Sequence, residues 1–213
     1  MFRDRIDAGH QLAEKLMKFK DENVVVLAIP RGGLPLGAIV AKALQAPLDV
    51  ALTKKIGHPS NKEYAIGAVS LDNIILTNDM GVNKEYIIEE TERIREKLLK
   101  RHDEYYKNRL PQNVKDRTVI IIDDGIATGN TLLATIELVS KQGPKKIIVA
   151  IPVAPNSAIR KLESTLKVDE VICLQVPYNF QAVGQFYEEF YQVSDQEAIQ
   201  LLEKAYTSTK TNP

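Results

Sequence analysis

Apolar residues follow two alternating patterns along the chain. Short uninterrupted apolar runs are typical of strands buried on both faces, and they occur at residues 49–52 and, more strongly, at 24–29, 118–122, 147–151 and 171–174. Between these runs apolar residues recur every three or four positions, as on one face of a helix, at residues 7–20, 36–44, 84–109, 129–142, 158–166 and 194–202. Strands that alternate with helices predict an α/β fold with a doubly wound, mainly parallel sheet and helices on both faces.

One stretch departs from this alternation. Residues 54–63 are polar and include a glycine and a proline, which predicts a mobile loop. Residues 65–71 and 74–76 predict a β-hairpin, and residues 84–109 predict a long charged helix. The apolar edge of that helix consists of Ile87, Thr91, Ile94, Leu98 and Tyr105. A single stripe favours a solvated helix packed along one side, and a contact between two subunits is the alternative.

Capping residues mark the ends of the predicted helices. Asp7 is the expected N-cap of the first helix, and Ser194 is that of the last, where Glu197 completes a capping box. Residues 207–213 predict a frayed tail. We therefore expect a single domain over residues 1–206, followed by that tail.

The composition fits a globular protein, with 44% hydrophobic residues. Lys+Arg and Asp+Glu both number 28, so the net charge gives no attraction to nucleic acid or to a membrane surface. No apolar run is long enough to span a bilayer, and the N-terminus lacks the apolar segment of a signal peptide. The single cysteine, Cys173, lies in an apolar run, which predicts a buried inert thiol. A cytoplasmic protein is expected.

Candidate chemistry concentrates where one buried strand ends. The run at 118–122 is followed by Asp123 and Asp124, and then by a loop containing glycine and threonine that leads into the predicted helix at 129–142. Carboxylates accept hydrogen bonds from hydroxyl groups, and loop amides at a helix N-terminus bind anions. The pattern predicts a site for a polyol that carries a phosphate. An acidic turn that merely caps the helix is the alternative.

Two further candidate groups follow other predicted strands. A turn of Arg31, Gly32 and Gly33 follows the first strand, and Lys54-Lys55 follows the second. The carboxyl ends of parallel strands meet at one edge of a sheet, so we expect these groups near the acids. The chain contains neither Gly-x-x-x-x-Gly-Lys-Ser/Thr nor Gly-x-Gly-x-x-Gly, which argues against a generic nucleotide-binding protein.

Residues 119–131 closely match the signature of the type I phosphoribosyltransferases, in which an apolar strand, two acids and a Thr-Gly loop follow one another. The resemblance extends over about residues 2–202, and the chain is most similar to the bacterial and archaeal group labelled predicted phosphoribosyltransferase. The Arg-Gly-Gly turn and the stretches 54–68 and 182–190 recur together in that group. The family ligand is 5-phosphoribosyl-1-pyrophosphate with magnesium. The resemblance therefore implies an enzyme that transfers ribose 5-phosphate to a nitrogen acceptor and releases pyrophosphate.

The resemblance assigns the ribose phosphate to residues 123–131, here called the acidic loop. Asp123 and Asp124 would bind the ribose 2′- and 3′-hydroxyls and stabilise the positive charge that develops as pyrophosphate leaves. The loop around the 5′-phosphate would consist of Ala127, Thr128, Gly129, Asn130 and Thr131. Mg²⁺ would arrive on the substrate phosphates, so that the two acids reach the metal only indirectly, through the substrate.

The pyrophosphate is assigned to Arg31, Gly32 and Gly33, because glycine amides and a guanidinium suit an anion. Family members often carry a non-proline cis peptide in this loop, which here implies the Arg31-Gly32 bond. Lys54 and Lys55 would form a second cationic clamp, on the pyrophosphate or on a phosphate of a neighbouring molecule's substrate.

The residues after that clamp, 57–64, would form a flexible loop that closes over the site and excludes water. An exposed basic loop is the alternative for this whole stretch.

The acceptor is less defined. Members that use hypoxanthine or guanine carry an Asp where this chain has Ala127, so the loop is closer to the adenine, uracil and orotate patterns. Glu63 is a candidate proton acceptor, with an ordinary surface glutamate as the alternative. Phe180, Phe186 and Tyr187 would form a hood that stacks on a base, unless they pack in the core.

The resemblance also implies partners. We expect the donor and a nucleobase as ligands, a homodimer, no nucleic acid and no membrane, with a small hood contributed by the N-terminal segment and residues 175–206. The rival hypothesis is a non-catalytic regulatory protein that binds the donor and controls another protein or an RNA, and the neutral overall charge argues against it.

Overall fold

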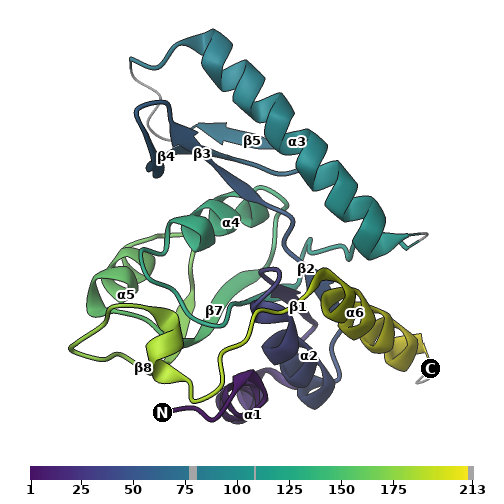
Figure 1. Cartoon of the computed structure of the whole chain (residues 1–213). Coiled ribbons are helices and arrows are strands. Elements are labelled where there is room, and N and C mark those ends of the chain that lie inside the picture. The colour runs from purple at the N-terminus through teal and green to yellow at the C-terminus, as the bar shows by residue number, and fades with distance from the viewer. Residues whose placement is uncertain (77–80, 108, 211–213) are drawn as a thin grey trace.

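The computed structural model describes residues 1–76, 81–107 and 109–210, apart from the side chains of residues 63 and 208–210. Its centre is a sheet in the order β2-β1-β6-β7-β8, in which every neighbouring pair is parallel. These strands are β1 (Val24–Ala28), β2 (Leu48–Val50), β6 (Thr118–Ile122), β7 (Lys146–Val153) and β8 (Glu170–Gln175). Figure 1 shows the helices around them, which are α1 (Arg5–Leu16) and α2 (Gly33–Leu44) on one face and α4 (Asn130–Ser140) and α5 (Asn156–Glu163) on the other. The predicted doubly wound α/β fold is confirmed.

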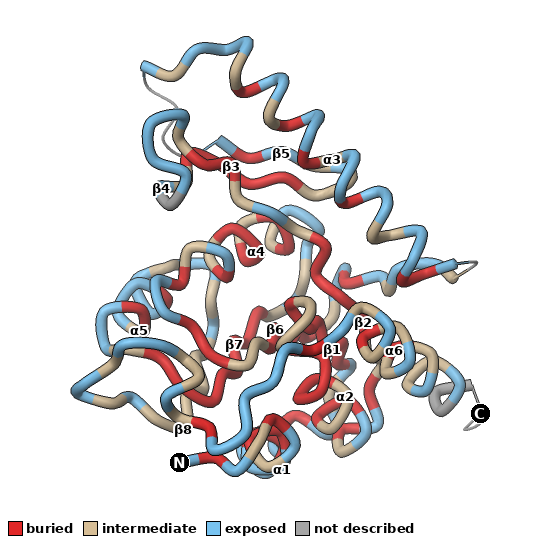
Figure 2. The backbone as a smooth tube through the Cα atoms, viewed as in Figure 1, coloured by how far each residue is buried: buried red, intermediate tan, exposed pale blue. Residues whose placement is uncertain are grey.

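The central strands supply two cores because successive side chains point to opposite faces. In β6, Ile120 and Ile122 pack with α1 and α2, whereas Val119 and Ile121 pack with α4 and α5. All residues of β1 and β6 are buried (Figure 2). Burial on both faces explains the uninterrupted apolar runs, and it fixes the strand ends from which the candidate loops begin.

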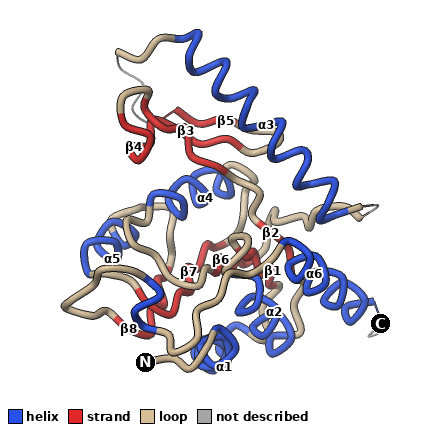
Figure 3. Tube along the Cα trace, viewed as in Figure 1, coloured by secondary structure: helices blue, strands red, loops and turns tan. Residues whose placement is uncertain are grey.

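A second, antiparallel sheet stands beside the first (Figure 3). It consists of β3 (Lys54–His58), β4 (Asn61–Val69) and β5 (Ile74–Leu76). The long helix α3 (Lys84–Tyr106) packs on one side of this sheet, and α4 packs on the other. The predicted stripe of α3 is confirmed, since each of its members is buried: Ile87, Thr91, Ile94, Leu98 and Tyr105.

Residues 54–58 form β3 and residues 61–63 begin β4, with only a two-residue turn between them, so the prediction of a loop over 54–63 is wrong. The strand pattern was hidden because the pairing register shifts on both sides of Gly57, and such a bulge interrupts the alternation of apolar and polar side chains. A side chain on Gly57 would lie 2.5 Å from the carbonyl oxygen of Lys62. The hairpin predicted after this stretch is confirmed by the antiparallel pairing of β4 with β5.

Two helix ends differ from prediction. The N-cap of α1 is Asp4, whose carboxylate accepts a hydrogen bond from the Asp7 N–H at 2.8 Å, so Asp7 lies in the first turn. The last helix, α6 (Asp195–Lys210), includes most of the predicted tail, and residues 211–213 lie outside the described residues. The Ser194 cap is confirmed, because its hydroxyl accepts a hydrogen bond from the N–H three residues on at 3.1 Å.

The thiol of Cys173 is half-buried and donates a hydrogen bond to the carbonyl oxygen of Gln175 at 3.2 Å. Burial raises the pKa of this thiol to about 11, which keeps it protonated and unreactive at neutral pH. Within the described ranges, no helix has the length and apolar character needed to cross a membrane.

Candidate active site

The acid pair lies at the carboxyl end of β6, in the middle of the central sheet. The neighbouring strand β1 ends level with it, because the Ile29 N–H donates to the carbonyl oxygen of Ile122 at 2.8 Å. From these two strands the chain proceeds in opposite directions across the sheet, β1 toward β2 and β6 toward β7. Asp123 and Asp124 therefore stand at the topological switch point, where open α/β sheets bind ligands.

The turn after β1 packs directly on the acid pair. A methyl group on Gly32 would overlap the carboxylate of Asp124, and one on Gly33 would lie 2.5 Å from the carbonyl oxygen of Ile122. Only glycine permits backbone to approach this closely. The structure thus brings together two of the predicted groups, the acids and the Arg31-Gly32-Gly33 turn.

A cis peptide bond joins Pro30 and Arg31. The predicted Arg31-Gly32 bond is therefore wrong by one residue, because the resemblance located the loop and not the bond within it. The Arg31 guanidinium turns toward α6, with Nη1 3.3 Å from Oδ2 of Asp195, and the Tyr105 hydroxyl donates to Oδ1 of the same carboxylate at 3.0 Å. Burial and this carboxylate raise the pKa of Tyr105 to about 12, so the tyrosine remains a donor.

The two carboxyl groups influence each other's charge. Burial raises the pKa of Asp123 well above its usual range, and the negative charge of Asp124 raises it further. A hydrogen bond from the Asp124 N–H to Oδ1 of Asp123, 2.9 Å long, opposes that shift. A pair of this kind is stabilised by hydroxyl donors or by a neighbouring positive charge.

Arg5 is the functional candidate that the sequence analysis missed. Its Nε donates to Oδ2 of Asp124 at 2.9 Å, and Nη2 lies 2.8 Å from the same oxygen. The residues are 119 positions apart, so no local pattern links them. The first helix was expected to begin after Asp7, so Arg5 lay before it and its place in the first turn is known only from the structure.

The predicted 5′-phosphate loop joins β6 to α4. Ala127, Thr128 and Thr131 are exposed. Gly129 is the N-cap of α4 with φ +73°, a conformation that favours glycine, and its Asn130 neighbour donates its N–H to Thr128 Oγ1 at 3.5 Å. This arrangement presents a helix N-terminus beside the acids, as an anion site requires.

Gly125 is a second residue that the sequence analysis passed over. It has φ +146°, and a side chain there would lie 2.6 Å from Cγ1 of Val183 and 2.9 Å from Cγ1 of Val153. The short helix η2 (Val183–Phe186) therefore touches the acidic loop at this glycine. A glycine directly after two acids at a strand end was the signal for that contact.

The structure separates Lys54 from Lys55. Adjacent residues of a strand point to opposite faces, and Lys55 pairs with Ala68, whose face packs on α4. Lys54 is on the α3 face and exposed, and partial loss of hydration together with the positive charges of Lys97 and Arg93 lowers its pKa. Lys55 thus faces the helix that carries the phosphate loop, and Lys54 faces a cationic helix.

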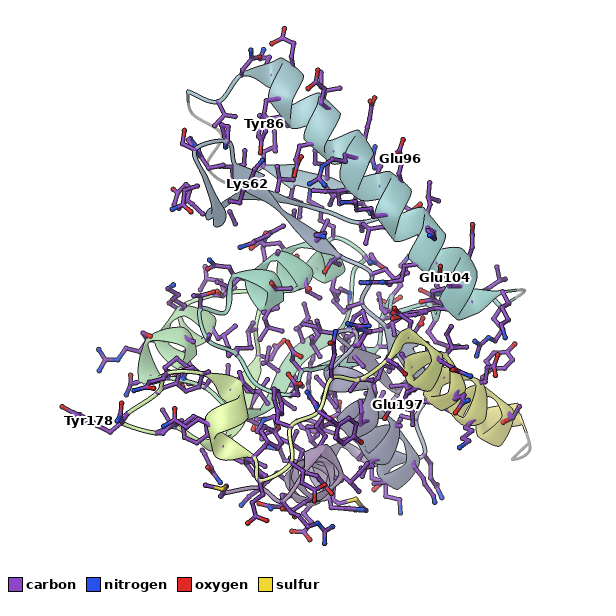
Figure 4. All side chains as sticks on the ribbon, in the orientation of Figure 1. Lys62, Tyr86, Glu96, Glu104, Tyr178 and Glu197 are labelled. Atoms are coloured by element: carbon purple, nitrogen blue, oxygen red, sulfur yellow. The ribbon has the colours of Figure 1, made fainter. Side chains whose placement is uncertain are left out.

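The predicted closing loop is fastened to α3. The Lys62 amine donates to the Tyr86 hydroxyl at 2.6 Å, and that hydroxyl donates to the carbonyl oxygen of Gly57, also at 2.6 Å. Figure 4 shows Lys62 on the small sheet and Tyr86 on α3 pointing toward each other. The side chain of Glu63, the candidate proton acceptor, lies outside the described residues.

The hood aromatics fall into two groups. Phe180 and Phe186 stack with ring centroids 5.4 Å apart and planes at 22°. Tyr187 is buried, its ring contacts Phe2, and its hydroxyl donates to the carbonyl oxygen of Asp124 at 2.6 Å. Tyr187 belongs to the core, and the Phe180–Phe186 pair packs against that same core while remaining partly exposed.

The N-terminal segment is hydrogen-bonded to this region. The Phe2 N–H donates to the carbonyl oxygen of Phe186 at 2.8 Å, and the Glu188 N–H donates to the carbonyl oxygen of Phe2 at 2.9 Å. These bonds hold the first residues of the chain beside residues 187–191, the segment that follows η2. Both segments therefore lie against the acidic loop, which Tyr187 contacts directly.

The acid pair fits a magnesium ion only indirectly. Among the described residues, no cluster of three or more His, Cys, Asp or Glu side chains could hold a metal. Oδ2 of Asp124 is engaged by Arg5. Such a donor set suits a metal that keeps its own waters and the oxygens of a bound phosphate.

Known proteins resemble this chain over most of its length. The family model for the phosphoribosyl transferase domain matches residues 4–187. A protein of Mycobacterium tuberculosis (strain H37Rv), named provisionally as a phosphoribosyl transferase, is 38% identical over 213 residues, which cover 97% of this chain and 47% of that protein. The chain thus spans about half the length of the curated relatives that it matches.

Solved structures agree with the fold. The crystal structure of TT1426 from Thermus thermophilus has a TM-score of 0.89 and 38% identity, and the match covers 96% of this chain and 98% of that one. A uracil phosphoribosyltransferase of Mycoplasma genitalium is 44% identical over 59 residues, or 28% of each chain. The likeness to TT1426 extends over nearly the whole chain.

Proposed function

Because the chain belongs to the phosphoribosyl transferase family, we propose that it transfers ribose 5-phosphate from 5-phosphoribosyl-1-pyrophosphate to a nitrogen of a nucleobase and releases pyrophosphate. The observation that carries this proposal is the contact between the two halves of a donor site. Gly32 lies so close to the Asp124 carboxylate that a methyl group would overlap it. A turn suited to pyrophosphate thus adjoins acids suited to a ribose diol.

Each part of the donor has a matching group. Asp123 and Asp124 accept hydrogen bonds from the ribose hydroxyls, and the exposed loop with Thr128 and Thr131 binds the 5′-phosphate. The Arg31 guanidinium and the Gly32 amide bind the pyrophosphate, because the Gly33 amide already donates to the carbonyl oxygen of Ile29 at 3.0 Å. The bond from C1′ to the pyrophosphate oxygen breaks as the base nitrogen attacks, and the carboxylates stabilise the cationic sugar more strongly than the ground state.

Magnesium is proposed as a companion of the donor. When bound, the ion neutralises pyrophosphate charge as that group leaves. Asp123 and Asp124 contribute through the ribose hydroxyls that they orient, and Lys55, on the face toward α4, adds positive charge near the phosphates. Lys54 is retained as part of the cationic clamp, at a greater electrostatic cost because of its cationic neighbours.

Several features support a nucleobase acceptor. Phe180 and Phe186 stack on each other and are partly exposed, and aromatic rings of this kind suit a flat base. Ala127 offers no carboxylate for the base's proton, which favours a pattern like that of uracil members. The short likeness to a uracil phosphoribosyltransferase agrees with this choice. Nucleotide salvage, a homodimer and a cytoplasmic setting remain predictions.

A base panel tests the proposal. The protein is incubated with the donor, Mg²⁺ and single bases, including uracil, adenine, hypoxanthine and orotate, and pyrophosphate release is measured. Release that depends on one base supports the transferase. Tight donor binding without release on any base contradicts it and supports the regulatory alternative, whereas an absence of donor binding contradicts both.

A further inference from the structure

Arg5 is a buried cation in a place that local structure does not favour. It is the first residue of α1, and its side chain is only 8% exposed. Positive charge near a helix N-terminus is unfavourable, and burial of an unpaired guanidinium costs far more. A partner outside the helix must therefore account for its position, and that partner is Asp124.

The contact fixes one oxygen of the carboxylate. Nε and Nη2 of Arg5 both approach Oδ2 of Asp124, at 2.9 and 2.8 Å. Gly32 packs against the same carboxylate, and a methyl group there would overlap Oδ2. Any rotation of the Asp124 side chain would lose these contacts. Arg5 thus engages Oδ2, and Oδ1 is the oxygen to which we assign the ribose hydroxyl.

The same guanidinium reaches the segment after η2. Nη1 donates to the carbonyl oxygen of Tyr191 at 2.6 Å, and the central carbon lies 3.9 Å from the ring centroid of Phe190. Tyr187, four residues earlier, donates its hydroxyl to the Asp124 carbonyl oxygen. Arg5 thus joins α1, the acidic loop and this segment in one network, in which each group has a partner.

We propose that Arg5 is a positioning residue of the candidate active site, which holds the Asp124 carboxylate so that Oδ1 accepts a ribose hydroxyl. This inference rests on the proposed function, because it assigns the diol to the acid pair. Arg5 itself acts through Asp124 and does not contact the pyrophosphate. A purely structural alternative is that Arg5 only fastens residues 187–191.

Two simple ligands separate positioning from structure. Ribose 5-phosphate uses the acid pair and the phosphate loop, whereas inorganic pyrophosphate uses the Arg31 turn. Calorimetry with Mg²⁺ present should show that Arg5→Met weakens ribose 5-phosphate binding about tenfold or more, since a charge-assisted hydrogen bond is lost. Pyrophosphate binding should change by less than about twofold. Arg5→Lys, which retains the charge but not the fork of donors, should give an intermediate loss.

Arg117 provides a matched control at the other end of β6. Its guanidinium is also partly buried, and it donates to the carbonyl oxygens of Val24 at 2.8 Å and Asn113 at 3.4 Å. Arg117→Met should lower the urea midpoint of unfolding and leave ribose 5-phosphate affinity unchanged. A loss of affinity in this control equal to that of Arg5→Met would overturn the positioning assignment.

The outcomes also distinguish this proposal from the proposed function. If Asp124→Asn loses ribose 5-phosphate binding while Arg5→Met and Arg5→Lys retain it, the donor site stands and the positioning proposal fails. Equal weakening of both ligands by Arg5→Met assigns Arg5 to structure only. If the unaltered protein binds neither the donor nor either ligand, the proposed function fails and the positioning proposal fails with it.

Discussion

The two sheets of the molecule hold their candidate ligand groups in different ways. Asp123 and Asp124 end a strand that is buried on both faces, and Asp124 is held by contacts with Gly32, Arg5 and Tyr187. The lysines of β3 start a strand of the small sheet, where Lys54 is exposed and surrounded by like charge. The central sheet therefore presents groups that are fixed before a ligand arrives. The small sheet presents charges that a bound anion would stabilise.

The largest effect is expected when the fixed carboxylate of Asp124 is removed. Asp124→Asn should keep the fold. It should lower turnover with the nucleobase that supports pyrophosphate release by about 10²–10³-fold, since it removes a negative charge that stabilises the developing cation. Steady-state kinetics measure the effect. Asp116→Asn is the matched control, because Asp116 is an exposed acid at φ +58°, a conformation that Asn tolerates. Unchanged kinetics in Asp124→Asn would contradict the diol assignment.

The next largest effect is expected when the close contact between Gly32 and the Asp124 carboxylate is disrupted. Gly32→Ala inserts a methyl group into the Asp124 carboxylate, so we expect donor affinity to fall at least tenfold and the free energy of unfolding to fall by about 1–3 kcal/mol. Calorimetry and urea unfolding report the two effects.

Gly143→Ala is the control for that substitution. Gly143 has φ +71° and a neighbouring atom no closer than 3.8 Å, so strain alone should lower stability and leave the donor unaffected. If Gly32→Ala binds the donor normally, the contact between the turn and the acids does not form the site.

A smaller effect is expected on stability when the hydroxyl of Tyr187 is removed. Tyr187→Phe removes the hydroxyl that donates to the Asp124 carbonyl oxygen, which is then left without that donor. The free energy of unfolding should fall by about 1 kcal/mol. Tyr178→Phe is the control, since that side chain is fully exposed and points away from the fold (Figure 4). Equal urea midpoints for both variants would show that the Tyr187 bond adds nothing to stability.

The central sheet, and the place of the acid pair at the end of one of its strands, could be predicted from the sequence because their signals are local. A strand buried on both faces has an uninterrupted apolar sequence. One such run is followed directly by Asp123, Asp124 and the loop to Thr131. The small sheet was partly missed, since the bulge at Gly57 breaks its alternation. Motifs and resemblance thus predicted the family, which the comparisons confirm.

What the sequence could not predict depends on contacts between distant residues. Arg5 reaches Asp124 across 119 positions, and Tyr187 reaches it across 63. The segment after η2 has no regular period, so nothing in its pattern reveals that it crosses the acidic loop. Such contacts are fixed by tertiary packing, and only the folded structure places them.

The two lysines of β3 give the finest test of the comparison. Lys55 shares a face with Ala68 toward α4, so Lys55→Met should raise the KM for the donor several-fold through loss of charge near the phosphates. Lys54→Met should affect the donor less. The pKa of Lys54 is lowered in the folded state, so its charged form opposes folding below that pKa.

Removal of the Lys54 charge should therefore raise the urea midpoint slightly at pH 7, and the gain should shrink as the pH rises toward 10.5, the ordinary pKa of lysine, where the unaltered side chain also loses its charge. Kinetics and urea unfolding across that pH range measure both variants. A larger KM effect from Lys54 than from Lys55 would reverse the assignment of the two faces. The small sheet would then direct its charge toward the donor from the α3 side.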